Sequence, residues 1–332
     1  NSAVLNRTVE RGGEIVMLGL IALPQMLRLG YDRKLAIGII CAAGALATLI
    51  PPSVVLIVYG LAAQVSITKL FAASAVPGLI LAGLYITYIL VRVRLKPEMA
   101  PIYDIPETAL PFFQRLKFLK GIILPAILIG TVLGVIYSGV ATVTEAAAIG
   151  AIGALVVAAA RKELKWTMAR DAMRQTVITV GSIIWLVIGA VSLIGIYNRI
   201  GGGDFLRGVL TTLDIGPIWV IVVMMLIVML LGTFLEWIAI IFITVPIFAP
   251  VVIDLGFDPV WFGVLFAMNI QMYYLSPPFG PACFFLKSVA PKDITLQEIF
   301  VAVLPFIALQ AVGLALVLFN PKIALWLPSL FE

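Results

Sequence analysis

LIPPSVVLIVYG (49–60) and LSPPFGPACFFL (275–286) each place a Pro-Pro pair inside a long apolar run. Proline has no backbone N–H, and its ring clashes with the preceding helical turn, so two consecutive prolines interrupt a helix that contains them. Pro51-Pro52 and Pro277-Pro278 therefore predict two broken helices. The alternative is that each pair only kinks its helix.

The composition places these runs in a membrane. Of the 332 residues, 62% are hydrophobic and 12% are charged, and the mean hydropathy is +1.15. A soluble domain is roughly 45–50% apolar. Apolar stretches long enough to cross about 30 Å of hydrocarbon recur along the whole chain. We therefore expect an all-α polytopic membrane protein.

The residue content excludes several classes of function. The chain has no histidine, so it cannot form a Ser-His triad, a His-ligated zinc site or a haem-ligating histidine. It contains no Walker-type phosphate loop. The net charge of +5 comes from basic residues between apolar runs, which fits cytoplasmic loops better than nucleic-acid binding. Cys41 and Cys283 lie in apolar segments, where we expect buried small side chains rather than a disulfide.

The two broken segments belong to an internal repeat. A shift of 226 residues, the spacing between Pro51 and Pro277, superimposes the two Pro-Pro pairs without a gap. The same shift places LGYD (29–32) on LGFD (255–258). Leucine matches arise by chance in so apolar a chain, but a Gly-aromatic-Asp turn and a Pro-Pro pair at one spacing indicate a duplicated unit.

The charge distribution predicts the orientation of the two copies. The turn 27–34 and the loops 92–120 and 161–174 are rich in Lys and Arg, which places them in the cytoplasm by the positive-inside rule. Five spans then bring the turn 255–258 to the outside, so the copies are inverted. The apolar stretch 216–258 is either two full crossings or one re-entrant hairpin, and the charge count does not separate these alternatives.

Inverted repeats with matched helix breaks at mid-membrane are typical of secondary transporters. An interrupted helix frees backbone carbonyls that coordinate cations, and the N-terminal ends of half-helices attract anionic substrates. Irregular backbone is tolerated in hydrocarbon only where protein buries it or where it lines a wet cavity. Simple proline kinks fit one lone pair better than two pairs at equivalent positions of a repeat.

The first break supplies three candidate residues for a sodium site, Gly44, Thr48 and Ser53. They lie close to the carbonyls that the prolines free, and hard oxygen ligands suit Na⁺ better than a transition metal. The alternative for the two hydroxyls is a hydrogen bond back to their own helix, which explains them equally well.

The second break offers Asn269, Gln271 and Ser276. Asn269 is the stronger candidate of the three, because a buried amide in hydrocarbon is costly unless it has partners. Glu236 lies at the tip of the predicted hairpin and is the only ionisable residue in 215–253. Its carboxylate can bind a cation, carry a proton or cap a half-helix.

A further polar group begins a small-residue helix in GVATVTEAAAIGAIGAL (139–155). Thr142, Thr144 and Glu145 are weaker site candidates. Glu145 in a first helical turn fits an ordinary helix cap, and the Ala and Gly face fits close helix packing.

Several of these stretches together resemble one family, the large membrane subunit of tripartite ATP-independent periplasmic (TRAP) transporters, the DctM-like proteins. The similarity covers nearly the whole chain from about residue 15. Its final part, from Phe234 onward, most resembles the branch labelled mannitol/chloroaromatic compound transport. The stretches that carry the resemblance are GALATLIPPSVVLIVYG (44–60), SITKLFAASAVPGLIL (66–81), GVATVTEAAAIGA (139–151) and the segment from GTFLEW (232–237) to LSPPFGPACFF (275–285).

The resemblance implies a Na⁺-driven elevator-type importer of organic acids such as dicarboxylates, in the bacterial inner membrane. Na⁺ is the coupling ion, and no other cofactor is implied. The implied partners are a small four-helix membrane subunit and a periplasmic substrate-binding protein. Sodium sites in the family lie where each hairpin tip meets a broken helix. That location corresponds here to 44–53 and to 232–236 with 269–277, which adds Gly232 and Thr233 to the candidates.

Two features depart from the family pattern. Glu236 stands where an Asp is common, so we expect a different setting of the hairpin tip. Family members usually begin well upstream and carry a Ser/Gly-rich first hairpin tip, whereas the equivalent stretch here is NRTVER (6–11), with three charges. We therefore expect an N-terminally truncated chain that does not transport unaided.

The predicted organisation has five parts. They are an atypical N-terminal remnant (1–14), a first repeat (15–94), a cytoplasmic linker (95–120), intervening scaffold spans (121–216) and a second repeat (217–332).

The main alternative function is a proton-coupled organic-anion carrier of similar architecture, with Glu236 as its proton site. An intramembrane Ser-Lys protease would need a lysine at membrane depth, but every lysine here maps to a loop or a span end. A non-transporting scaffold and a passive channel are further alternatives, and neither needs a sodium gradient.

Overall fold

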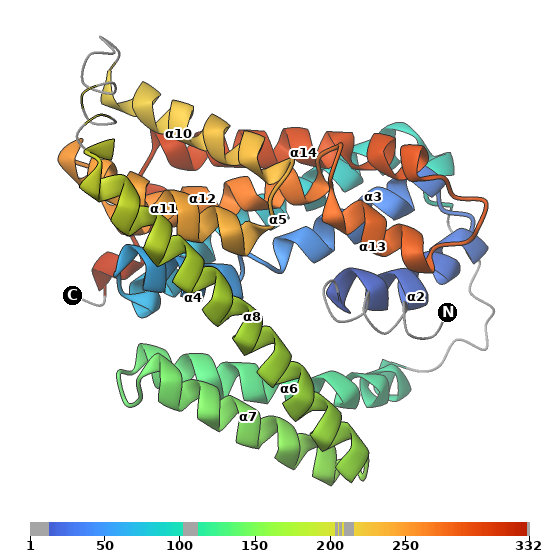
Figure 1. Cartoon of the computed structure of the whole chain (residues 1–332). Helices are drawn as coiled ribbons and strands as arrows, with labels where there is room; N and C mark the ends of the chain where they lie inside the picture. The colour runs from blue at the N-terminus through green and yellow to red at the C-terminus, as the bar shows by residue number, and fades with distance from the viewer. Residues whose placement is uncertain (1–12, 102–111, 203–204, 206–207, 209–215, 331–332) are drawn as a thin grey trace. The chain divides into compact units, whose positions relative to one another are not determined.

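The computed structural model describes residues 13–101, 112–202, 205, 208 and 216–330, without the side chains of 112–122, 194 and 198. Every secondary-structure element in those ranges is a helix, which confirms the all-α prediction (Figure 1). The chain divides into two compact units. The first unit comprises Asn1–Ile102 and Ala190–Glu332, and the second comprises Tyr103–Gly189.

Two of the predicted parts fall largely outside the described residues. Residues 1–12 hold most of the predicted remnant 1–14 and the charged stretch 6–11. Residues 102–111 belong to the predicted linker 95–120.

Within the described residues, the first half of the larger unit has four helices and a short 3₁₀ turn. The helix α3 begins after a tight turn in which Gly30 has φ +78°, a left-handed conformation that favours glycine. The Asp32 carboxylate then caps α3 by accepting a hydrogen bond from the Leu35 N–H at 2.9 Å. The elements are α2 (Gly13–Arg28), α3 (Arg33–Leu46), α4 (Val54–Ala63), α5 (Ile67–Leu95) and η1 (Pro97–Met99).

The second half repeats this pattern and adds a preceding helix. Gly256 has φ +82°, and the Asp258 carboxylate accepts a hydrogen bond from the Val260 N–H at 2.6 Å. Both the glycine turn and the aspartate cap therefore recur. The elements are α10 (Pro217–Gly232), α11 (Trp237–Asp254), α12 (Pro259–Leu275), α13 (Pro281–Val289), α14 (Leu296–Phe319), α15 (Lys322–Leu325) and η2 (Pro328–Leu330).

The helix ends confirm the internal repeat. A shift of 226 residues carries α2, α3, α4 and α5 onto α11, α12, α13 and α14, and every end agrees within three residues. Equivalent helices also pack on equivalent partners in the opposite half. The helix α2 packs on α13, and its equivalent α11 packs on α4. Likewise α3 packs on α14, and its equivalent α12 packs on α5. Figure 1 shows α2 beside α13. This pattern is what a two-fold relation between the halves produces.

The two halves are inverted, as the charge distribution predicts. The start of α3 lies where α5 ends, since the Asp32 N–H donates to the Met99 carbonyl at 2.8 Å. The start of α12 lies at the opposite end, because the Trp261 indole N–H donates to the Val317 carbonyl at 2.9 Å, close to the end of α14. The Tyr59 hydroxyl, near the end of α4, donates to the Pro259 carbonyl at 2.8 Å. Equivalent helices therefore start at opposite ends of the unit.

The segment 217–254 forms a helical hairpin, and the position of its tip supports the re-entrant alternative. Its arms α10 and α11 pack against each other, and at 1.5 Å per residue a 16-residue arm spans about 24 Å, less than the hydrocarbon core. Gly232 at the tip lies against Tyr273, near the end of α12. The tip is therefore level with the helix break, and α13 continues beyond it.

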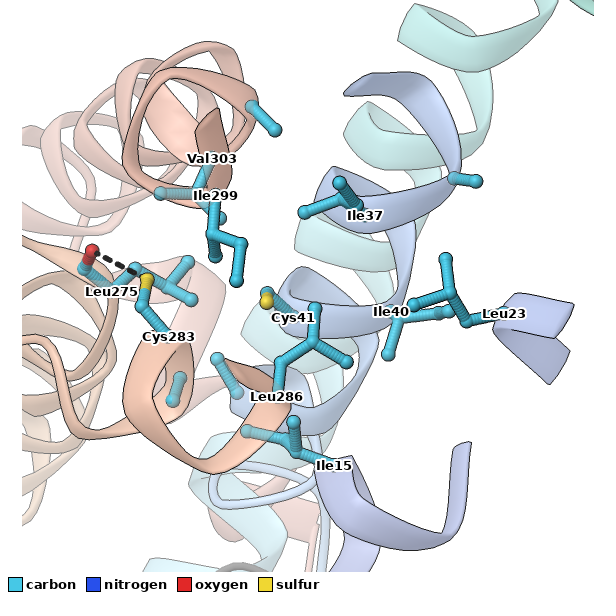
Figure 2. Close-up of a cluster of buried hydrophobic side chains, with 14 of the residues drawn as sticks. Ile15, Leu23, Ile37, Ile40, Cys41, Leu275, Cys283, Leu286, Ile299 and Val303 are labelled. Carbon is cyan, nitrogen blue, oxygen red and sulfur yellow. Dashed lines mark hydrogen bonds between the residues drawn. The ribbon is translucent and has the colours of Figure 1, made fainter. Parts of the chain in front are cut away.

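A buried apolar cluster joins the two halves beside the second break (Figure 2). Cys41 and Cys283 are both buried free thiols in this cluster, as predicted. The Cys283 thiol donates to the Leu275 carbonyl at 3.6 Å. The cluster has members from both halves: Ile15 and Leu23 from α2, Ile37, Ile40 and Cys41 from α3, Leu275 from α12, Cys283 and Leu286 from α13, and Ile299 and Val303 from α14.

The smaller unit contains α6 (Phe112–Tyr137) and α7 (Val143–Ala160), which form an antiparallel pair, and most of α8 (Trp166–Arg199). A Cβ on Gly153 of α7 would overlap the Leu128 side chain of α6, so the glycine permits close packing. Five helices in the described residues are long and apolar enough to cross a membrane. They are α5, α7, α8 over Trp166–Tyr197, α11 and α14.

Candidate functional site

The first break lies between α3 and α4 and contains Pro51-Pro52. In an uninterrupted helix the N–H of residue 51 would bond to the carbonyl of Ala47, and that of residue 52 to the carbonyl of Thr48. Neither proline has an N–H to donate. The helix accordingly ends at Leu46, several residues before the prolines.

Ser53 replaces one of the missing donors. Its hydroxyl donates to the Thr48 carbonyl and accepts a longer hydrogen bond of 3.4 Å from the Leu56 N–H, so it also caps α4. The Ser53 side chain is buried. The Thr48 hydroxyl donates to the Ala45 carbonyl at 2.8 Å. Both hydroxyl protons are thus used within the break, whereas the oxygens keep lone pairs available to a cation.

The glycine at this break allows a close helix contact. Gly44 is buried in α3, and a Cβ there would overlap the Ile15 side chain of α2. The start of α2 is therefore level with the first break, as the hairpin tip is level with the second.

The second break, around Pro277-Pro278, leaves equivalent groups without their helical donors. Ser276 ends α12, and its hydroxyl donates to the Met272 carbonyl at 2.6 Å. The Gly280 N–H donates to the Ser276 carbonyl at 2.8 Å, which closes a tight turn into α13. Among the described residues, no hydrogen bond reaches the carbonyl of Ala47 at the first break or that of Tyr274 at the second.

The hairpin tip docks on the helix that leads into the second break. The buried Asn269 amide of α12 donates to the Met225 carbonyl of α10 at 2.6 Å. Gly232 has no room for a side chain, because a Cβ would overlap the Tyr273 ring. The Thr233 hydroxyl donates to the Leu230 carbonyl at 2.7 Å and ends α10. Gly232 and Asn269 therefore both lie where α10 packs on α12, and Thr233 ends α10 beside Gly232.

Glu236 occupies the N-cap position of α11 but makes no capping hydrogen bond with its side chain. Its side chain is exposed at the tip. The carboxylate lies close to the Tyr273 phenol, which also approaches the Trp237 backbone. Within the described residues, the Glu236 carboxylate makes no hydrogen bond or ion pair. Among the described residues, no hydrogen bond joins this group to Thr48 or Ser53 of the first break.

Thr142, Thr144 and Glu145 lie in the smaller unit. The Glu145 carboxylate accepts hydrogen bonds from the Thr142 N–H at 2.7 Å and hydroxyl at 2.8 Å, and the Thr142 hydroxyl accepts one from the Glu145 N–H at 3.3 Å. This reciprocal capping box starts α7. Thr142 and Glu145 therefore act as the N-terminal cap of α7.

Tyr273 and Gln310 escaped the prediction, whereas Gln271 was a candidate at the second break and ranked below Asn269. Tyr273 closes the hairpin tip, and no sequence signal marks it, because only the docking of the hairpin brings it to the site. Gln271 and Gln310 are fully buried, and within the described residues neither amide has a hydrogen-bond partner. A buried amide in an apolar run is a readable signal, and it ranks Gln271 with Asn269.

Comparison with known proteins identifies the family of the chain. Residues 12–323 match the family described as "Tripartite ATP-independent periplasmic transporter, DctM component". The C4-dicarboxylate TRAP transporter large permease protein DctM of Pseudomonas aeruginosa is 31% identical over 320 residues, which cover 95% of this chain and 72% of that protein.

Two further relatives carry other substrate names. The sialic acid TRAP transporter large permease protein SiaM of Vibrio cholerae is 30% identical over 317 residues, with 95% of this chain and 72% of that protein covered. The ectoine/5-hydroxyectoine TRAP transporter large permease protein UehC of Ruegeria pomeroyi is 29% identical over 320 residues, with the same coverage. The chain therefore belongs to the DctM family of tripartite ATP-independent periplasmic transporters, whose members are multi-pass inner-membrane transport components and not enzymes.

Proposed function

We propose that the chain is the large permease subunit of a Na⁺-coupled secondary transporter that imports organic acids. The observation that carries the proposal is the pair of helix breaks at equivalent positions of an inverted repeat, each level with the start or tip of a hairpin arm. The named relatives transport C4-dicarboxylates, sialic acid or ectoine by their titles, and each of these solutes bears a carboxylate.

Each break offers oxygen ligands for a cation and helix N-terminal N–H groups for an anion. The carbonyls of Ala47 and Tyr274 and the hydroxyls of Thr48, Ser53 and Ser276 are oxygen ligands of the kind that Na⁺ takes. The half-helices α4 and α13 begin at the breaks, and their N-terminal N–H groups favour the carboxylate of a substrate. Sodium bound beside these ends would strengthen anion binding, so solute and ion would bind cooperatively.

The architecture also supports an elevator mechanism with two partners. Both breaks and the hairpin lie in one compact unit, so a movement of that unit would carry both sites together. A periplasmic binding protein would deliver the organic acid, and a small four-helix membrane subunit would complete the membrane complex. The family title, a tripartite periplasmic transporter, supports both partners.

The test is the thermal stability of the purified protein in Na⁺ and in K⁺ at equal ionic strength. A ligand that binds only the folded state raises the stability by RT ln(1 + [L]/Kd). We expect saturable stabilisation by Na⁺ that Thr48→Ala, Ser53→Ala or Asn269→Ala reduces. Ser66→Ala is the matched control, since Ser66 caps α5 away from both breaks. Equal stability in the two cations would reject sodium coupling.

The free carboxylate of Glu236 favours a second candidate, a proton-coupled carrier of the same architecture. Glu236→Gln separates the two in an uptake assay. A proton carrier loses its dependence on the pH gradient in this variant, whereas a sodium carrier keeps its dependence on Na⁺.

A further inference from the structure

A basic hollow lies at one end of the larger unit, far along the chain from both breaks. It has a volume of about 220 Å³ and opens between the start of α3, the end of α5, η1 and α14. Its polar lining consists of Lys34, Tyr88 and Arg92. This end gathers the basic segments around 33–34 and 92–96, which the positive-inside rule places at the cytoplasmic surface.

Lys34 lies in the first turn of α3, directly after the cap and its neighbour Arg33. The Asp32 carboxylate caps the helix by accepting from the Leu35 N–H. The Arg33 guanidinium pairs with Asp293 at 2.6 Å and with Glu298 at 3.2 Å. Lys34 forms no ion pair within the described residues. Its ammonium group is therefore available to an anionic ligand.

Arg92 provides a second cation without a counter-ion. Its guanidinium lies 6.0 Å from the centre of the Tyr88 ring, a distance at which a cation–π attraction orients the side chain. The described residues show no carboxylate paired with Arg92. Lys34 and Arg92 thus line one hollow, and neither of them forms an ion pair within the described residues.

The rest of the hollow is apolar, and the helices around it are apolar towards the membrane. Its floor includes Met99, Pro305 and Phe306. Leu90 and Val91 of α5 and Val301 and Leu304 of α14 are exposed on the adjoining surface. In a ligand with a phosphate and hydrocarbon chains, the phosphate would contact the cations and the chains would contact the apolar surface. A small soluble anion would contact only the cations.

An adjoining hollow of about 300 Å³ differs in charge. It is lined by Lys34, Arg92 and Lys96 and also by the acids Asp32 and Glu98. The Asp32 carboxylate is engaged as the cap of α3. The inner hollow, which has no acid in its lining, is therefore the place where a phosphate is most favoured.

We propose that the inner hollow binds the phosphate headgroup of an anionic phospholipid of the cytoplasmic leaflet, with its acyl chains along α5 and α14. Lys34 and Arg92 are the headgroup residues. The hollow is smaller than a typical pocket of about 300–1,000 Å³ for an enclosed ligand, which suits a headgroup whose chains remain in the bilayer. This site is separate from the helix breaks and does not depend on sodium coupling.

The test is a titration of the purified, delipidated protein with phosphatidylglycerol, read by native mass spectrometry. Lys34→Gln and Arg92→Gln are each expected to weaken the tightest binding step about fivefold, as about 1 kcal/mol per cation near a membrane surface implies. Arg92→Lys should retain most of the affinity. Arg94→Gln is the matched control, because Arg94 is an exposed cation in the same last turn of α5 and does not line the hollow.

Equal weakening by Arg94→Gln and Arg92→Gln would overturn the proposal, because binding would then depend on net charge alone. No weakening by Lys34→Gln or Arg92→Gln would also overturn it. Displacement of the lipid by millimolar glycerol 3-phosphate would show a site for soluble anions rather than for lipid. Folding of each variant is checked by its unfolding temperature. The readout is lipid binding without transport, so it can succeed or fail independently of the proposed function.

Discussion

Single residues decide how the broken helices close. Two prolines remove two donors from each break, and at the first break a side-chain hydroxyl replaces one of them. At the first break the Ser53 hydroxyl takes the place of the absent Pro52 N–H at the Thr48 carbonyl. The hydroxyls of this break therefore donate hydrogen bonds to nearby carbonyls, as their sequence allowed. Their oxygens keep lone pairs that a cation could use.

The first prediction concerns Ser53→Ala. The change removes the cap of α4 and leaves the Thr48 carbonyl without a donor, so we expect a loss of about 1–3 kcal/mol in the free energy of unfolding. Ser66→Ala removes only a cap and should cost about 1 kcal/mol. The free energy of unfolding of the two variants is compared by unfolding each of them in a graded series of denaturing detergent. A smaller loss in Ser53→Ala than in Ser66→Ala would contradict the donor role of Ser53.

The second prediction concerns Gly232→Ala. An added Cβ overlaps the Tyr273 ring, so the tip must shift, and we expect a loss of about 1–3 kcal/mol in unfolding free energy. Gly83→Ala is the control, since a Cβ at Gly83 in α5 meets no atom within 4 Å. That change should be neutral or stabilise by up to about 1 kcal/mol. An equal change in the free energy of unfolding in the two variants would mean that the tip is not packed on α12.

At the scale of elements, the hairpin and the broken helix form one unit of structure. The sequence left open whether 216–258 crosses the membrane twice or returns. The contact of Gly232 with Tyr273 places the tip level with the break, which supports a re-entrant hairpin. Glycine and a short apolar arm are visible in a sequence, but the partner of the tip is not, since it lies 41 positions away along the chain.

The third prediction concerns Asn269→Leu. The Asn269 amide joins α12 to α10 through the Met225 carbonyl, and leucine keeps the volume while it removes the donor. We expect faster hydrogen exchange in α10 and α11 and unchanged exchange in α3 and α4. A second variant, Gln310→Leu, provides the comparison, because the Gln310 amide has no partner in the described residues. Faster hydrogen exchange throughout the larger unit in both variants would show that the Asn269 hydrogen bond does not stabilise α10 and α11 in particular.

At the scale of the whole molecule, the inverted arrangement of the two halves is the main result. The ion pairs of Arg33 with Asp293 and Glu298 link the halves at one end. Exposed pairs of this kind contribute little, about 0.2–1 kcal/mol each. Buried apolar packing therefore contributes more to the attachment than these ion pairs do. It comprises the cluster of α2, α3, α12, α13 and α14 and the packing of α4 and α5 on α11, α12 and α14.

The fourth prediction tests the inversion with a matched pair of labels. Leu29 and Leu255 are equivalent under the repeat and lie in turns at opposite ends of the unit. With Cys41 and Cys283 replaced by alanine, Leu29→Cys should react with an impermeant thiol reagent only from the cytoplasmic side. Leu255→Cys should react from the outside in intact cells. Labelling of both positions from one side would refute the inverted topology.

The sequence by itself determined the class of protein, the repeat, both helix breaks and most of the candidate residues. These features rest on composition, on proline chemistry and on spacing, which are local properties of the chain. Only the tertiary structure decided which carbonyl Asn269 binds, that Tyr273 closes the hairpin tip, and that Lys34 and Arg92 line one hollow. Those pairings join residues far apart in the chain, and they depend on how inverted helices pack, which no periodicity along the sequence encodes.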